Sequence, residues 1–264
     1  MRPGSLRSSY GPWAVVAGAS EGLGAAFVRR LAADGLNVVA IARREEPLRA
    51  LAAQVAAEHG VEVRAVALDL ARSDLPEALA VAVEGLEVGL GIYNAAASFV
   101  APLLARPPAD VQQVVDVNVR GPLHFVHALA PAMVARGRGG LVLMSSLAGN
   151  QGSPRLAAYA ASKAFTTSLG ESLWAELRPE GVDVVTCCAG AIRTPGYAKA
   201  LTKDAPGTLD PDDVAQAALG ALGHGPLVTP GATNRLATVI MRRVLPRRAA
   251  IAIMGRSLAG LEPE

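Results

Sequence analysis

The feature that most constrains the fold is a glycine-rich turn near the N-terminus. Gly18, Gly22 and Gly24 follow the apolar run 13–17 and precede a segment with apolar residues at helical spacing. This order predicts a strand, a tight turn and a helix. Glycines let the backbone turn sharply and approach a ligand closely, and a helix N-terminus offers unpaired N–H groups to a pyrophosphate. The turn is therefore a candidate phosphate-binding loop.

Strands and helices alternate along the rest of the chain. Runs rich in β-branched residues, separated by helical patterns, predict a parallel sheet covered on both faces. The expected fold class is α/β: one Rossmann-type doubly wound domain, residues 1–264, with about seven parallel strands and a C-terminal helical extension at 231–264. The expected strands are 14–16, 38–41, 61–68, 90–93, 141–144, 182–187 and 227–229. The expected helices are 21–34, 45–59, 76–83, 109–136, 157–177 and 211–222.

Composition limits the partners and the setting. The 264 residues are 51% apolar, enough for a large core, and a net charge of +2 gives no reason to expect nucleic acid. Cys187 and Cys188 are adjacent in an apolar strand pattern and are expected to be buried thiols. No metal site is expected. The sequence shows neither a membrane span of ~18 apolar residues nor a signal core, so a cytoplasmic location is expected.

A tyrosine and a lysine share one face of a predicted helix. Tyr159 and Lys163 stand four residues apart, and Ser146 lies thirteen residues before the tyrosine. An ammonium one turn away should lower the phenol pKa from its usual ~10, so that the tyrosine can exchange a proton with an alcohol or carbonyl oxygen. A nearby serine hydroxyl could polarise the same oxygen. Alone, the spacing also fits a helix without a chemical role.

The positions of several motifs indicate a single site. Gly18, Asn94, Ser146 and Gly190 each follow a predicted strand. Ligands of an open doubly wound sheet bind beyond the carboxyl ends of its strands. These four residues are therefore expected to meet in one crevice.

The motifs, in this order, resemble the short-chain dehydrogenase/reductase family, from about Trp13 to Pro195. The resemblance implies that Asn118, Ser146, Tyr159 and Lys163 are catalytic. The expected cofactor-binding residues are Gly18, Ser20, Glu21, Gly22, Leu23, Gly24, Arg43, Arg44, Asp69, Leu70, Asn94, Ala95, Tyr159, Lys163, Gly190, Ile192 and Thr194.

The end of the second strand predicts the form of the cofactor. A carboxylate there would accept a hydrogen bond from the 2′-hydroxyl of NAD and repel a 2′-phosphate. The chain has Ala42 in that place, followed by Arg43 and Arg44, and guanidinium groups pair well with phosphate. NADP (NADPH) is therefore preferred and NAD is less favoured. Alternatively, both arginines are solvated and pair with Glu45 or Glu46.

Asn118 lies in a long helical segment that continues into Gly121 and Pro122. Proline removes a backbone donor, so a kink is expected near Asn118. The resemblance implies that the kink frees a backbone carbonyl for a water that Lys163 contacts. The alternative is a polar residue that satisfies a broken helical turn.

The chain departs from the family pattern at two places. The run Tyr93-Asn94-Ala95-Ala96 stands where the family usually has Asn-Asn-Ala-Gly, and Ala189 stands where it usually has proline. Neither removes a catalytic group, but both bear on cofactor affinity and local geometry.

The C-terminal part has two segments of interest. Residues 194–209, rich in proline and glycine, are expected to form a substrate lid. Residues 234–245 are amphipathic, with apolar residues on one face and arginines nearby. This face is expected to pack against the substrate site or a neighbouring subunit. A membrane partner is not expected, although peripheral contact through 234–248 is the alternative. The apolar residues of this face are Leu236, Val239, Ile240 and Val244.

The sequence thus predicts an NADP(H)-dependent oxidoreductase that reversibly reduces a ketone to a secondary alcohol. The tail resembles that of members acting on lipophilic ketones, such as 17β-hydroxysteroid or long-chain 3-ketoacyl reductases, so a bulky apolar substrate is expected. A homodimer or homotetramer is also expected. The alternatives are a non-redox dehydratase or epimerase of the same family, and a cofactor-binding sensor or scaffold. An intact Ser-Tyr-Lys set argues against a sensor.

Overall fold

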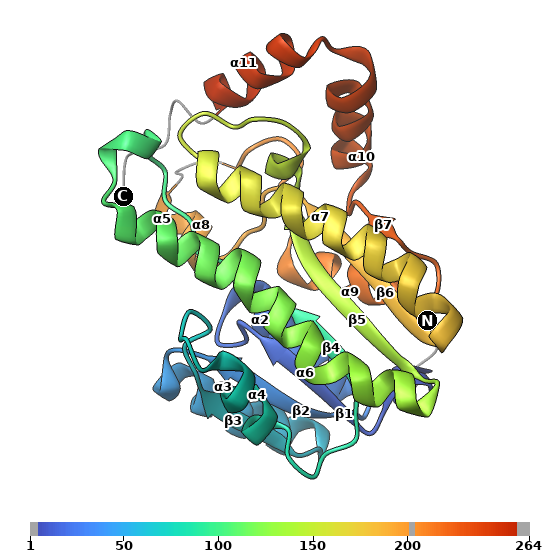
Figure 1. The fold of residues 1–264 in the computed structure, drawn as a ribbon. Coiled ribbons are helices and arrows are strands. Elements are labelled where there is room, and N and C mark those ends of the chain that lie inside the picture. Colours follow the sequence, from blue (N-terminus) through green and yellow to red (C-terminus); the bar gives the residue numbers. More distant parts are fainter. Residues whose placement is uncertain (1–4, 201–203, 258–264) are drawn as a thin grey trace.

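One sheet of seven parallel strands lies at the centre of the molecule (Figure 1). The computed structural model describes residues 5–200 and 204–257. The strand order is β3-β2-β1-β4-β5-β6-β7, and every neighbouring pair is parallel. The predicted fold class is therefore confirmed. The strands are β1 Trp13–Ala17, β2 Asn37–Ala42, β3 Val63–Ala67, β4 Val88–Tyr93, β5 Gly139–Ser146, β6 Val182–Ala189 and β7 Leu227–Val228.

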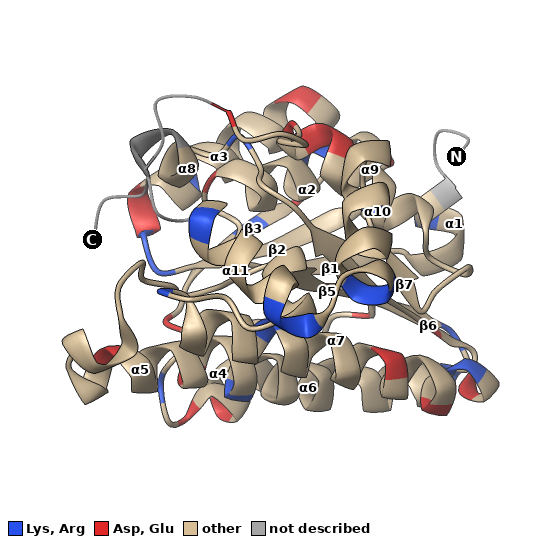
Figure 2. Ribbon diagram, turned by 90° about the horizontal axis from the view of Figure 1, so that it is seen from above, with Lys and Arg blue, Asp and Glu red and all other residues tan. Residues whose placement is uncertain are grey.

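Helices cover both faces of the sheet, as Figure 2 shows from above. α2, α3 and α9 lie on one face, and α4, α6 and α7 on the other. The described helices are α1 Ser5–Tyr10, α2 Gly22–Ala33, α3 Glu45–His59, α4 Leu75–Ala82, α5 Pro108–Val115, α6 Gly121–Arg136, α7 Ala157–Leu177, α8 Pro195–Ala200, α9 Pro211–Gly220, α10 Ala232–Val239 and α11 Arg247–Ser257.

Two apolar cores result from the alternation of side chains along the strands. In β1, Val16 joins the core beneath α2 and α3, whereas Val15 joins the core beneath α4 and α6. Because both faces are buried, the strands read as continuous apolar runs rather than alternating ones. Cys187 and Cys188 in β6 are buried free thiols, as the sequence predicts.

Helix ends follow local sequence signals. α3 begins with Glu45 and Glu46, whose charges suit the positive N-terminal end of a helix dipole, and ends at Gly60 in the left-handed region, with φ +66°. α3 and α7 have the predicted bounds. The long helix expected at 109–136 is instead divided into α5, a π-helical turn at Asp116–Arg120, and α6.

Up to Ser257, where the described residues end, the C-terminal extension contains α10, a π-helical turn at Ile240–Val244, and α11. The apolar face expected on this segment is present, but its side chains are exposed, including Leu236 and Val244. The prediction that this face packs against the substrate site of the same chain is therefore wrong, whereas packing against a neighbouring subunit stays a prediction. The reason is that α10 leaves the body after Pro230 and projects beyond the sheet (Figure 1).

In the described residues, no helix has the length and apolar character needed to cross a lipid bilayer.

Replacing Phe27 by alanine tests the core beneath α2. This side chain is fully buried, and deleting a buried aromatic ring usually costs about 3–5 kcal/mol of unfolding free energy. Leu104→Ala is the control, because Leu104 is 98% exposed and should change stability by no more than about 0.5 kcal/mol. Urea unfolding of both variants measures the difference, and equal losses would contradict this placement of α2.

Candidate active site

The turn between β1 and α2 has the backbone that its glycines permit. Gly18 has φ +84° and Gly22 has φ +54°, both in the left-handed region that side chains disfavour. A Cβ at Gly24 would collide with the carbonyl oxygen of Gly18. The three glycines therefore allow a close turn at the N-terminus of α2, where N–H groups lack helical partners.

Loops that follow three different strands meet at this turn. Asn94, after β4, donates through Nδ2 to the Gly18 carbonyl oxygen at 2.8 Å. A Cβ at Gly18 would lie 2.6 Å from the amide nitrogen of Ala95. On the other side, a Cβ at Gly22 would lie 2.8 Å from the Thr194 methyl carbon, which belongs to the loop after β6. The structure thus brings Asn94, Ala95 and Thr194, three of the predicted cofactor residues, to the glycine turn.

Ser146 ends β5 beside the end of β6. Ser146 and Ala189 are the last paired residues of the two strands. The alanine that stands in place of the family's proline is therefore the final residue of β6. The Ser146 Oγ accepts a hydrogen bond from the Ala148 amide at 3.2 Å. Ala96 is exposed and is not among the described residues with positive φ, so its position does not require glycine.

α7 brings the tyrosine and the lysine to the end of β5. Lys163 is buried, its Nζ donates to the Met144 carbonyl oxygen at 2.7 Å, and Nζ lies 5.6 Å from the centre of the Tyr159 ring. The Ser145 hydroxyl donates to the Lys163 carbonyl oxygen at 2.8 Å. Side chain and backbone of the lysine are therefore both fixed to β5.

Burial dominates the electrostatics of this pair. It raises the pKa of the Tyr159 phenol, and a hydrogen bond with the Ser146 side chain acts in the opposite direction. Burial also lowers the pKa of the Lys163 ammonium to about 8. The sequence predicted a lowered tyrosine pKa. In the structure the pKa is raised instead, because desolvation of the phenolate outweighs the hydrogen bond with Ser146.

Asn118 is buried in the π-helical turn and holds the loop after β4. Its Oδ1 accepts from the Ala97 amide, and its Nδ2 donates to the Ala97 carbonyl oxygen, both at 2.8 Å. Nδ2 also donates to the Ser162 hydroxyl at 2.9 Å, and that hydroxyl donates to the Tyr159 carbonyl oxygen at 2.7 Å. The asparagine therefore connects the loop after β4 to the helix that carries the tyrosine.

The π-helical turn takes the place of the predicted kink. An α-helix would pair the Asn118 carbonyl with the N–H of residue 122, and Pro122 has none. The carbonyl of the preceding residue, Val117, accepts a hydrogen bond from the buried Tyr93 hydroxyl at 2.6 Å. That hydroxyl occupies the space where a Cβ on Gly121 would stand. Widening to a π turn absorbs the proline without breaking the helix.

The two arginines after β2 differ in their contacts. Arg44 pairs with Glu21 at 2.7 Å and donates to the Ser20 hydroxyl at 3.5 Å, so it lies against the glycine turn. Glu45 pairs instead with Arg49. Arg43 is exposed and forms no ion pair with a described residue. The alternative of pairing with Glu45 or Glu46 is therefore wrong for Arg44.

The remaining predicted cofactor residues follow β3, begin α2 or follow β6. After β3, Asp69 is exposed and its Oδ1 accepts from the Ala71 amide at 3.0 Å, whereas Leu70 is buried. Leu23 is buried at the start of α2. Ile192 forms a parallel bridge with Leu209, beyond Gly190.

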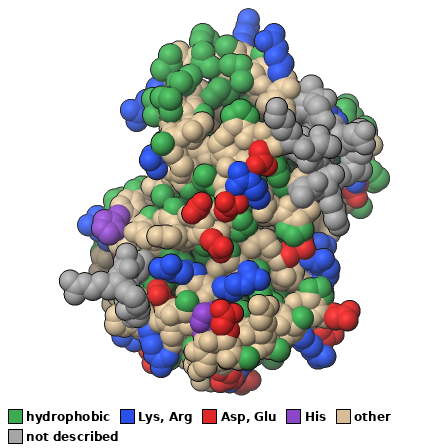
Figure 3. Space-filling model, turned by 180° about the vertical axis from the view of Figure 1, so that it is seen from behind, with side chains coloured by type: hydrophobic (Ala, Val, Ile, Leu, Met, Phe, Trp, Pro, Cys, Tyr) green, Lys and Arg blue, Asp and Glu red, His purple; other side chains and the backbone are tan. Residues whose placement is uncertain are grey.

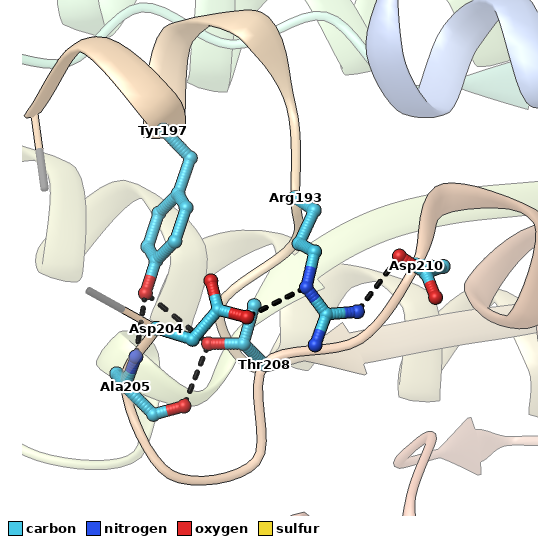
Figure 4. A network of polar contacts seen from close by, with 6 residues as sticks. All are labelled: Arg193, Tyr197, Asp204, Ala205, Thr208 and Asp210. Carbon is cyan, nitrogen blue, oxygen red and sulfur yellow. Dashed lines mark hydrogen bonds and ion pairs between the residues drawn. The ribbon is translucent and has the colours of Figure 1, made fainter. Parts of the chain in front are cut away.

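Ion pairs of Arg193, directly before the segment expected to be a lid, reach into this segment and to the residue that follows it. Figure 4 shows Arg193 between Asp204 and Asp210, at 2.6 and 2.7 Å. In the same network, the Tyr197 hydroxyl lies 3.1 Å from the Thr208 hydroxyl and accepts from the Ala205 amide at 2.9 Å. The start of the segment contains the short helix α8 rather than a continuous loop.

Some contributors to the site carried no sequence signal. Met144 and Ala97 act through backbone atoms, which any residue would supply. Ser162 was visible between the tyrosine and the lysine, three residues after Tyr159. At that spacing in a helix, a serine hydroxyl can donate a hydrogen bond to the carbonyl oxygen three residues earlier.

The comparisons with known proteins identify the family. A family model described as short chain dehydrogenase matches residues 12–205. The 7β-hydroxysteroid dehydrogenase of Collinsella aerofaciens is 32% identical over 237 residues, 88% of this chain and 90% of that protein. The very-long-chain 3-oxoacyl-CoA reductase of Aspergillus clavatus is 38% identical over 69% of this chain. That match spans only 55% of the fungal protein.

Solved structures agree. A 7β-hydroxysteroid dehydrogenase structure has a TM-score of 0.90 and 30% identity, over 94% of this chain and 98% of that one. A short-chain dehydrogenase from Sphingobium yanoikuyae in complex with NADPH has a TM-score of 0.75 and 28% identity, over 83% and 87%. The chain therefore belongs to the short-chain dehydrogenase/reductase family, as predicted, and is an oxidoreductase acting on the CH–OH/C=O pair.

The buried lysine predicts a pH dependence of stability. Folding lowers the pKa of Lys163 from 10.5 to about 8. Between these values the unfolded chain binds more protons, so stability rises with pH. We expect the unfolding free energy of the intact chain to gain about 2–3 kcal/mol over that of Lys163→Met between about pH 7 and about pH 10. Urea unfolding without cofactor measures this.

Tyr10 and Tyr93, whose pKa values are also raised by burial, titrate in both variants and cancel in the difference. Tyr159 and Cys188 interact with the Lys163 amine, so the difference reports the amine together with these two neighbours. Parallel pH profiles for the two variants would show that the folded chain does not lower the pKa of this amine.

Proposed function

We propose that the chain is an NADP(H)-dependent reductase that converts a ketone to a secondary alcohol, reversibly, with Ser146, Tyr159 and Lys163 as the proton-transfer groups. The observation that carries the proposal is their position. The three side chains lie at the end of β5, in the same sheet edge as the glycine turn.

The residues present fit a dinucleotide. The glycine turn provides a close backbone surface at a helix N-terminus, which suits a pyrophosphate. Asp69 and Leu70 would meet the adenine, and Asn94 and Ala95 the middle of the cofactor. Thr194, against Gly22 in the structure, would contact the carboxamide. When bound, the cofactor supplies a hydride to the carbonyl carbon.

The chain's own groups would act on the substrate oxygen. A raised pKa keeps the Tyr159 phenol protonated at neutral pH, which is the form that can donate a proton in reduction. The Ser146 hydroxyl would donate a hydrogen bond to the same oxygen and orient it. Lys163 would bind the nicotinamide ribose and favour the phenolate that remains. Asn118 would hold the adjoining loop and helix at a fixed distance.

The arginines after β2 support NADP over NAD. Arg44 already lies beside the glycine turn, and Arg43 is exposed and forms no ion pair within the described part of the chain. The NADPH complex of the Sphingobium relative agrees with this choice.

The substrate is proposed to be bulky and apolar, as in the hydroxysteroid and 3-oxoacyl-CoA relatives. Residues 194–209 would form its lid, with Arg193 paired to Asp204 and Asp210. A homodimeric or homotetrameric assembly and a cytoplasmic location stay predictions from the sequence.

Replacing Tyr159 by phenylalanine tests the proposed acid. We expect turnover to fall at least ~100-fold, the usual scale for loss of a general acid, while NADPH affinity stays within a few-fold. Turnover is followed by the loss of NADPH absorbance with a panel of cyclic and long-chain ketones, and affinity by fluorescence titration. A phenylalanine variant with nearly normal turnover would sink this mechanism. Lys163→Ala should reduce both turnover and cofactor affinity.

Replacing Arg43 and Arg44 together by alanine tests the cofactor preference. Charge-assisted bonds contribute roughly 1.5–3 kcal/mol each, so we expect NADPH binding to weaken by ~2–4 kcal/mol and NADH binding to change little. Arg49→Ala is the matched control, because Arg49 is an arginine of α3 that follows these two closely in the sequence but pairs with Glu45. Equal losses for both cofactors would show that the two arginines support the fold rather than a phosphate.

A further inference from the structure

Exposed apolar side chains gather on the C-terminal extension. We call residues 232–257 the C-terminal arm. It holds five of the nine large apolar side chains that are exposed in the described part of the chain. Their exposed fractions are Leu236 62%, Val239 50%, Ile240 37%, Val244 67% and Ile253 45%. Figure 3 shows an apolar patch at the top of the molecule with basic side chains at its borders.

The arm is also strongly basic. It contains six of the 25 basic residues and none of the 23 acidic ones. The rest of the chain therefore has 19 basic against 23 acidic residues, an excess of negative charge. None of the arm's arginines forms an ion pair with a described residue. They are Arg235, Arg242, Arg243, Arg247, Arg248 and Arg256.

Only the inner side of the arm is attached to the body. Asn234 donates to the carbonyl oxygens of Gly207 and Pro230, both at 3.0 Å. Ala250 is fully buried, and Ile251 lies 3.7 Å from the Cβ position of Gly152. The inner side thus has partners on the loop between Ser146 and Tyr159, whereas the apolar outer side has none among the described residues.

Charge decides which partner suits the outer side. Symmetric pairing of two arms would bring six arginines against six with no acid between them, which is unfavourable. Elsewhere on the chain, the exposed Leu103, Leu104 and Val115 lie near Asp110 and Asp116, but both carboxylates already pair, with Arg106 and Arg120. An apolar surface bordered by cations matches the boundary between anionic headgroups and acyl chains.

We propose that the C-terminal arm docks the enzyme on an anionic lipid bilayer, with its apolar side chains in the interface and its arginines at the headgroups. Arg247 is the exception, because its Nη1 donates to the Asn150 carbonyl oxygen of the body at 2.8 Å. The docking does not cross the membrane. It goes beyond the proposed function and does not depend on it. It competes with the expectation that a neighbouring subunit covers this face.

Vesicle co-sedimentation of the full chain tests the proposal. The vesicles are phosphatidylcholine with roughly 30 mol % phosphatidylserine, and pure phosphatidylcholine serves for comparison. We expect binding to the anionic vesicles, weakening at least ~10-fold as salt rises from roughly 0.1 M to roughly 0.5 M, and little binding to the neutral ones. Equal binding to both kinds, or none to either, would overturn the proposal.

Variants separate the arm from the rest of the surface. Arg242→Glu with Arg243→Glu should reduce anionic binding at least ~10-fold, and Leu236→Ser with Val244→Ser should also reduce it. Arg29→Glu with Arg178→Glu makes the same charge change at exposed sites on the body and should retain binding. Thermal unfolding and NADPH titration confirm that each variant is folded. Unchanged binding in the arm variants would refute the assignment.

Light scattering without lipid tests the competing possibility that a second copy of the chain covers the outer face. If the arm variants convert an oligomer to a monomer while the intact chain ignores anionic vesicles, the outer face is a subunit interface and the proposal is wrong. Because every readout is binding or mass, a failed proposal here leaves the reductase assignment to be judged by its own assays.

Discussion

The candidate site depends on the contact between α7 and the end of β5. Parallel strands deliver Ser146 to the sheet edge, but the tyrosine belongs to a helix that could slide along the sheet. Two hydrogen bonds oppose sliding, from Lys163 to the Met144 carbonyl and from Ser145 to the Lys163 carbonyl. They fix α7 at one height, so the spacing of serine, tyrosine and lysine in three dimensions follows from strand register and helix position together.

The same contact sets the electrostatics. Fixing the helix this closely removes water from both the phenol and the amine, which raises one pKa and lowers the other. Each group is thereby moved toward its neutral form. A cofactor that brought polar groups into this edge would change the balance, so proton transfer and cofactor binding are expected to be coupled through solvation as well as through direct contact.

The fold and the site differ in how far the sequence could predict them. Apolar runs and glycine positions were sufficient for the sheet, for α3 and for α7, because burial on both faces leaves a continuous signal. The π-helical turn itself could not be predicted. Pro122 implies that a helical hydrogen bond is lost, but it does not say whether the helix kinks or widens in response. The sign of the tyrosine pKa shift also required the structure, because burial depends on what packs around the ring. The exposed face of the arm was missed because amphipathicity shows which side is apolar and not whether anything covers it.

Tyr93 and Gly121 illustrate how a departure from a family pattern spreads. Tyr93 stands where the family usually has asparagine, and its hydroxyl holds the Val117 carbonyl of the π-helical turn. The same hydroxyl fills the volume that any side chain at position 121 would need. The two positions therefore form a coupled pair: a relative with tyrosine at the first must have glycine at the second, and a relative that loses the tyrosine is free to gain a side chain there. Covariation between these two positions would mark the branch of the family that stabilises the π-helical turn around Asn118 in this way.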